Sequence, residues 1–144
     1  MRTAIVLLLA ACSQSADPPA DTVRVDISRK GGFSPTPAAG STCTPMDDSY
    51  TLTIGTQLLT WQRCESQTAG GVYSFTPGQA TLDDSAFEML SIAIDNVHAV
   101  QPPCAGDLTD TFTFTTSSGV TTLAGVQCDA NDPAVFELLL SDAH

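Results

Sequence analysis

The feature that most constrains this chain is a pair of cysteines, Cys43 and Cys64, that brackets alternating apolar and polar residues. Alternation with a period of two is typical of half-buried strands. A two-residue type II′ turn is expected at Gly55-Thr56, because glycine suits the position that needs a positive φ. This turn places Leu52 opposite Leu59, so the sequence predicts a β-hairpin with a cysteine near each open end.

A second pair, Cys104 and Cys128, brackets a similar segment. Threonine and phenylalanine alternate strictly along 111–115, and a return strand follows the turn. If the turn is Ser117-Ser118, Cys128 falls opposite Asp107, and a longer turn would shift this register. Internal duplication and convergence on bracketed hairpins explain the likeness of the two segments equally well.

Four cysteines allow three disulfide connectivities. The pairing Cys43–Cys64 and Cys104–Cys128 is expected, because it closes each hairpin at its own open end. A zinc site is the alternative, but the sequence has no C-x2-C pair and no histidine near the cysteines. The sequence therefore predicts two disulfides.

The fifth cysteine, Cys12, ends an apolar run over 4–11 that follows Arg2. The residues Leu9-Ala10-Ala11-Cys12 resemble the lipobox of a bacterial lipoprotein signal peptide. The resemblance implies cleavage before Cys12 and acylation of its sulfur and new amino terminus, which would anchor the chain stably. The run is too short to cross a bilayer as a helix. An ordinary secretory signal with a chance cysteine is the alternative.

The export that this resemblance implies would place the other cysteines in an oxidising compartment, where disulfides persist. Ser13 follows Cys12, and by the enterobacterial sorting pattern this implies the outer membrane. The expected organisation is a signal peptide over 1–11, a flexible tether over 12–21 and a single domain over 22–144. The tether prediction rests on its prolines and small residues.

The charge of the chain is strongly negative, at −11 with 16 acidic and 5 basic residues. We do not expect the chain to bind nucleic acid directly, because the sequence lacks the basic patch that such binding requires. Adhesion to anionic lipid by charge is disfavoured for the same reason. The acidic balance favours solubility and self-repulsion at the cell surface.

The remaining periodicity predicts further strands and two helices. Strands are expected over 23–28 and 72–75, the second ending at Pro77-Gly78. An amphipathic helix is expected over 82–98, with Thr81 as its cap. A short helix over 133–140 follows Asp132, where proline suits the first turn. Met89 and Ile92 lie off the apolar stripe of the long helix and are expected to face another element or an interface.

These elements predict an α+β fold. An antiparallel sheet of two disulfide-stapled hairpins and the first strand packs on the long helix, and a short C-terminal helix completes the domain.

No arrangement of residues predicts catalysis. The two histidines, His98 and His144, stand near a helix end and at the last residue, so neither supports a catalytic triad. The segment 129–132 begins like a calcium loop, but Pro133 and Ala134 replace the required ligand and glycine. We expect no catalytic residues, no metal and no cofactor.

One short motif follows the first strand directly, Arg29-Lys30-Gly31-Gly32-Phe33. It resembles the start of the emfourin-type inhibitors of thermolysin-like metalloproteases, although Ser34-Pro35 departs from that pattern. The resemblance implies that a loop formed by these five residues contacts a metalloprotease. The alternative is a loop without a binding role, in which the side chain of Phe33 packs in the core.

Two functions remain as expectations. The first is a lipid-anchored envelope protein that acts as a non-catalytic binding module, with protease inhibition as one form of it. The second is a structural outer-membrane lipoprotein without a specific binding activity. An extracellular or periplasmic protein, such as a metalloprotease, is the partner that the first function implies.

Overall fold

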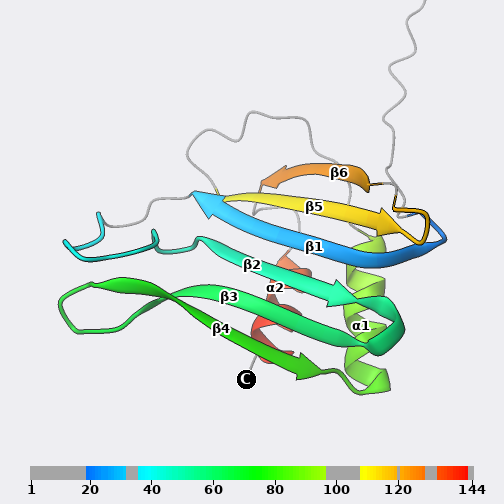
Figure 1. Ribbon diagram of the computed structural model, residues 1–144, viewed down its shortest axis with the longest axis horizontal. Helices are drawn as coiled ribbons and strands as arrows, with labels where there is room; N and C mark the ends of the chain where they lie inside the picture. The colour runs from blue at the N-terminus through cyan, green and yellow to red at the C-terminus, as the bar shows by residue number, and fades with distance from the viewer. Residues whose placement is uncertain (1–18, 32–35, 97–107, 120, 129–132, 143–144) are drawn as a thin grey trace, which may run out of the picture.

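The computed structural model describes residues 19–31, 36–96, 108–119, 121–128 and 133–142, and the chain has an α+β fold (Figure 1). The described residues form six strands, one 3-10 turn and two α-helices. In chain order these are β1 (Thr22–Gly31), β2 (Asp48–Thr53), η1 (Ile54–Thr56), β3 (Leu58–Ser66), β4 (Tyr73–Thr81), α1 (Asp84–Asp95), β5 (Leu108–Thr116), β6 (Thr121–Cys128) and α2 (Pro133–Asp142).

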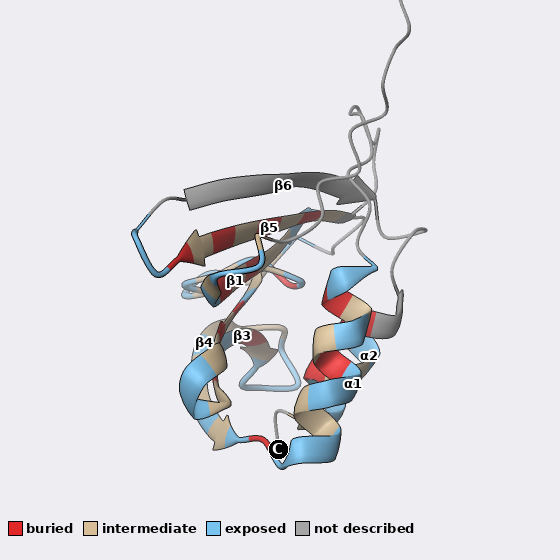
Figure 2. Cartoon of the chain, turned by 90° about the vertical axis from the view of Figure 1, so that its right-hand side faces the viewer, coloured by how far each residue is buried: buried red, intermediate tan, exposed pale blue. Residues whose placement is uncertain are grey.

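The strands form one antiparallel sheet in the order β4-β3-β2-β1-β5-β6. The first strand thus lies inside the sheet and joins the β2–β3 pair to the β5–β6 pair. Both helices pack on the same face of the sheet (Figure 2). No described helix covers the other face of the sheet, which we call the open face.

The core lies between the sheet and the helices. Alternate residues of β1, β2 and β5 point toward the helices and are fully buried, because the pleat turns every second side chain to one face. The buried apolar residues are Val25, Ile27, Tyr50, Leu52, Leu59, Leu82, Leu90, Ile94, Phe112, Phe114, Val135 and Leu139. The intervening residues line the open face with hydroxyl and carboxylate groups, as expected for an antiparallel sheet solvated on one side.

The pairing of β2 with β3 has the expected register, with Leu52 opposite Leu59. The turn differs from the prediction, because the chain forms the 3-10 turn η1 and Gln57 takes the left-handed conformation at φ 52°. The type II′ turn at Gly55-Thr56 was therefore wrong. The register survived because the longer turn is centred on the same two residues.

The register of β5 with β6 is shifted from the one predicted for a turn at Ser117-Ser118. Cys128 pairs with Thr109 rather than Asp107. A bulge between Thr111 and Thr113 accounts for part of the shift, since it adds a residue to one strand.

The strand β4 is longer than expected and runs through Pro77 and Gly78, which were predicted to end it. At the sheet edge a strand has one neighbour, so a proline can be tolerated there. The indole of Trp61 lies directly over Gly78, where a larger residue would overlap it. Both turn-forming residues are therefore accommodated inside a strand.

The helix α1 begins later than predicted. Asp83, not Thr81, is the N-cap, and its carboxylate accepts a hydrogen bond from the backbone N–H of Ala86 at 2.9 Å. A carboxylate at this position also interacts favourably with the helix dipole. The described helix ends at Asp95, and Met89 and Ile92 are about half exposed on its outer side, at 51% and 54%.

Candidate functional site

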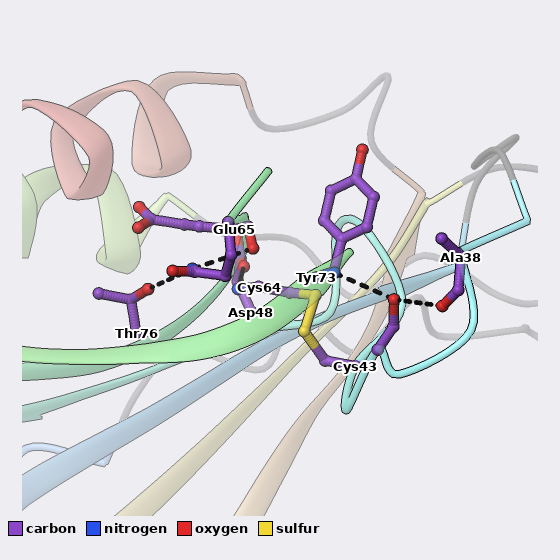
Figure 3. Close-up of a disulfide and its surroundings, with 9 residues drawn as sticks. Ala38, Cys43, Asp48, Cys64, Glu65, Tyr73 and Thr76 are labelled. Atoms are coloured by element: carbon purple, nitrogen blue, oxygen red, sulfur yellow. Dashed lines mark hydrogen bonds between the residues drawn. A yellow bond between two sulfur atoms is a disulfide. The ribbon is translucent and has the colours of Figure 1, made fainter. Parts of the chain in front are cut away.

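The disulfide Cys43–Cys64 fixes one end of the open face (Figure 3). The Cα atoms of the two cysteines are 5.9 Å apart. The expected staple on the first hairpin is therefore present. It ties the segment 36–47, which lacks regular secondary structure, to the end of β3, and we call this region the stapled end.

Backbone hydrogen bonds hold the segment 36–47 against the start of β4. The N–H of Thr42 donates to the carbonyl of Tyr73 at 2.9 Å, and the N–H of Ala38 donates to the carbonyl of Gly71 at 3.1 Å. The N–H of Tyr73 donates to the hydroxyl of Ser41 at 3.0 Å, and that hydroxyl donates to the carbonyl of Ala38 at 2.7 Å (Figure 3). The disulfide and these bonds give the stapled end a fixed shape despite its irregular backbone.

A hollow of about 280 Å³ lies on the open face, and one of its lining residues, Phe75, is the strand partner of Cys64. Strands β1 to β4 and the segment before β2 contribute to its walls. The side chains relevant to recognition are Ser28, Lys30, Asp47, Ser49, Gln62 and Phe75. Phe75 is 44% exposed, which is high for an aromatic ring on a strand, and Lys30 is exposed as well. The hollow thus combines one aromatic ring, one cation, the carboxylate of Asp47 and several uncharged hydrogen-bonding groups.

The structure separates the residues of the expected partner-binding loop. β1 continues through Gly31, so Arg29 and Lys30 belong to a strand rather than a loop. Consecutive residues of a strand point to opposite faces. Lys30 lines the hollow on the open face, whereas Arg29 points to the helix side. Gly32 and Phe33 lie outside the described residues.

Arg29 forms a buried ion pair with Asp110 of β5. Its Nε and Nη2 atoms donate to the two carboxylate oxygens at 2.8 and 2.9 Å. The side chains are only 12% and 1% exposed. A bidentate ion pair of this kind fixes the positions of both side chains. Arg29 therefore links β1 to β5 and is not an exposed contact for a partner.

The carboxylate of Asp48 lies next to this pair, at the start of β2. It accepts a hydrogen bond from the backbone N–H of Cys64 at 2.9 Å. Burial raises the pKa of Asp48, although this hydrogen bond and the positive charges of Arg63 and Arg29 act in the opposite direction. Burial also raises the pKa of Tyr50 to about 12, with the charge of Asp48 adding to the effect. The phenol therefore stays neutral at ordinary pH.

Other predicted site residues lie outside the described part of the chain. Cys12 and Cys104 are among them, so the lipid attachment and the second disulfide stay predictions. His98 also lies beyond the described end of α1. Within the described ranges, no group of three or more histidine, cysteine or acidic residues is placed to hold a metal ion. None of the helices that the structure describes is long and apolar enough to cross a membrane.

Sequence reasoning missed Phe75 as a surface residue. The strand 72–75 was expected, but its neighbour in the sheet was not, so the face of each residue was undetermined. The pairing of Cys64 with Phe75 now places the ring on the open face beside the disulfide.

Comparisons of the chain with protein-family models, with curated proteins and with solved structures found no match.

Proposed function

We propose that this chain is a lipid-anchored protein of the bacterial cell envelope that acts as a non-catalytic binding module. The lipobox-like sequence ending at Cys12 supports the anchor, and Ser13 supports an outer-membrane location. The stapled end supports the binding role, and it is the part of the surface that we assign to a protein partner.

The observation that carries the binding role is the exposed ring of Phe75 beside Lys30 in the hollow of the stapled end. Aromatic residues near the centre of an interface contribute strongly to affinity when they are desolvated by a partner. A rigid surface also loses less conformational entropy on binding than a mobile one. The disulfide and the hydrogen bonds of segment 36–47 provide that rigidity at this end of the sheet.

The second hairpin carries a matching staple in this proposal. Cys128 ends β6 and pairs with Thr109, five residues after Cys104. A disulfide Cys104–Cys128 would close the open end of the β5–β6 pair, as Cys43–Cys64 does for the β2–β3 pair. The two staples would fix the same end of the sheet on both sides of β1.

The binding role is tested by capturing secreted and envelope proteins from the source culture on the immobilised mature protein. We expect Phe75→Ala and Lys30→Ala to lose the captured partner while the melting temperature stays unchanged. The matched control is Met89→Ala, which removes an apolar side chain of similar exposure from the helix layer. Capture that survives Phe75→Ala, or that yields no specific protein, would favour the purely structural alternative.

The first partner to test is a thermolysin-like metalloprotease, because the segment 29–33 resembles the emfourin-type inhibitors. Of the two described charged side chains of this motif, Lys30 is exposed and Arg29 is mostly buried. Lys30→Ala should therefore weaken inhibition, whereas a loss with Arg29→Ala would reflect unfolding. If the wild-type protein at micromolar concentration slows no such protease, the inhibitor form should be dropped and the binding module kept.

A further inference from the structure

A second hollow on the open face lies over strands β2, β3 and β4, and we call it the central hollow. Its volume is about 350 Å³, which falls within the range of small-molecule sites. The side chains with hydroxyl or amide groups that line it are Ser49, Thr51, Thr60, Gln62 and Gln79. The serine and both glutamines are exposed and both threonines are half-buried, so the hollow is open to solvent.

Most of these polar groups are available to a ligand. The side chains of Ser49, Thr60, Gln62 and Gln79 make no hydrogen bond to other residues in the described part of the chain. Each hydroxyl and each amide can both donate and accept a hydrogen bond. Because the groups stand on neighbouring strands of one sheet, their backbone positions are fixed before a ligand arrives, which lowers the entropy lost on binding.

An adjoining hollow of about 260 Å³ extends this polar surface across the sheet. The hydroxyl-bearing residues Ser49 and Thr51 line both hollows, and Ser28, Thr111 and Thr113 line the adjoining one. Together the two hollows cross five neighbouring strands, from β4 to β5 (Figure 1). Neighbouring strands are spaced by about 4.8 Å, so the polar surface is about 19 Å wide. It is long enough for a chain of several sugar units.

The charge of this surface restricts the ligand. Of the described side chains that line the two hollows, Asp26 alone is charged at neutral pH. Its Oδ1 atom accepts hydrogen bonds from Nη2 of Arg24 at 2.6 Å and from the hydroxyl of Thr51 at 2.6 Å, so its charge is compensated within the chain. An anionic ligand would meet no cation in these hollows and would be repelled by the net charge of −11. An uncharged ligand is therefore favoured.

Sugars match both the polar and the apolar parts of the central hollow. Sugar hydroxyls donate and accept hydrogen bonds, as do the side chains that line the hollow. The exposed ring of Pro77 also lines it and offers an apolar contact for the carbon-bound hydrogens of a sugar ring. The same surface offers no deep apolar pocket for an uncharged ligand that lacks hydroxyl groups.

We propose that the open face binds an uncharged oligosaccharide that lies across β2, β3 and β4, with its hydroxyl groups hydrogen-bonded to Thr60, Gln62 and Gln79. The rest of the sugar chain extends over the adjoining hollow. This site is independent of the protein partner proposed for the stapled end, because Thr60 and Gln79 do not line the hollow that contains Lys30 and Phe75.

The test is a calorimetric titration of the full chain with three uncharged hexasaccharides: cellohexaose, β-1,4-mannohexaose and N-acetylchitohexaose. We expect at least one to bind with a Kd of about 1 mM or tighter. The disaccharide of the same sugar should bind at least tenfold more weakly, because it spans fewer strands. Hexagalacturonate, which carries carboxylates, should also bind at least tenfold more weakly. The proposal is overturned if none of the three hexasaccharides binds, or if hexagalacturonate binds as tightly as they do.

Two variants place the sugar in the central hollow. Thr60→Val and Gln79→Ala should each weaken binding about two- to tenfold, since each removes one uncharged hydrogen bond. Thr60→Ser keeps the hydroxyl and should retain binding. The matched control is Thr76→Val, because Thr76 stands opposite Arg63 and lies on the other face of β4. Should Thr60→Val fail to fold, Gln79→Ala at the exposed edge of the sheet decides by itself.

A last variant separates this site from the stapled end. Lys30→Ala should leave sugar binding unchanged, even though it is expected to lose the protein partner. Sugar binding that survives both Thr60→Val and Gln79→Ala, or that is lost with Lys30→Ala, would overturn the assignment to the central hollow.

Discussion

At the scale of single residues, β1 carries two arginine–aspartate pairs that differ in burial. Arg24 and Asp26 lie near the surface, with side chains 53% and 33% exposed, whereas Arg29 and Asp110 are 12% and 1% exposed. Breaking a buried pair leaves an uncompensated charge in the interior, while an exposed pair contributes little. Removing the arginine should therefore lower the stability of the protein far more at position 29 than at position 24.

We expect Arg29→Ala to lower the free energy of unfolding by about 3–5 kcal/mol, because Asp110 would remain buried without its partner. The matched control, Arg24→Ala, should cost at most about 1 kcal/mol. Urea unfolding followed by tryptophan fluorescence measures both. Equal losses for the two variants would show that Arg29 is not the buried tie between β1 and β5.

The carboxylate of Asp48 predicts a pH dependence of stability. Its pKa is raised in the folded protein because the group is partly buried. The stabilisation linked to its bound proton is complete below the unfolded pKa and is lost as pH rises through the raised folded pKa. Asp48→Asn keeps an oxygen that can accept from the N–H of Cys64 and cannot titrate.

We therefore expect the wild-type protein to lose stability as the pH rises just above the ordinary titration range of aspartate. The Asp48→Asn variant should not show this loss. Urea midpoints measured from pH 3 to pH 8 on both proteins give this difference directly. If the two curves stay parallel through that range, the pKa of Asp48 is not raised in the folded protein.

At the scale of elements, the edge strand β4 depends on the contact between Gly78 and Trp61. A methyl group on Gly78 would overlap the indole ring, so either the ring or the strand must move. Gly78→Ala should destabilise the protein by about 1–3 kcal/mol and shift the emission of Trp61. Gly55→Ala is the control, because its added methyl would meet no atom within 4 Å. Comparable melting temperatures for the two variants would count against the packing described for β4.

The staple of the first hairpin should contribute about 3 kcal/mol, because it restricts the unfolded chain between Cys43 and Cys64. Replacing both cysteines by serine, followed by urea unfolding, measures this contribution.

Peptide mapping without reduction should recover Cys43 joined to Cys64 and Cys104 joined to Cys128. A peptide that joins one pair to the other would refute the proposed pairing.

Elements with strong local periodicity could be predicted from the sequence, whereas their ends could not. The register of β2 and β3 followed from the alternation and from the position of the turn centre, even though the turn type was wrong. The end of β4 was missed because Pro77 and Gly78 usually interrupt strands. Their tolerance depends on the sheet edge and on Trp61, which are tertiary features.

The candidate site was less predictable for the same reason. Arg29 was expected to contact a partner, but its actual partner, Asp110, lies 81 residues away in sequence. Phe75 acquires its position from the pairing of β4 with β3, which no local pattern indicates. The disulfide Cys43–Cys64 was predictable because alternation and spacing placed both cysteines near the open end of one hairpin.

At the scale of the whole molecule, the proposed lipid anchor at Cys12 and the proposed binding surface on the sheet belong to the same chain. The helices cover one face, and the open face carries the stapled end with Phe75 and Lys30. The described chain begins at Pro19, which lies near Phe87 and Asp95 of α1. The strongly acidic balance of the chain favours solubility of such a domain at a membrane surface.

The anchor is the claim on which the cellular role depends, and intact-mass analysis of the native protein from the membrane fraction tests it most directly. We predict a mature chain that begins at Cys12 and carries the added mass of several acyl chains, because one chain alone binds a membrane only marginally. A soluble mature chain without added mass, beginning at any other residue, would contradict it.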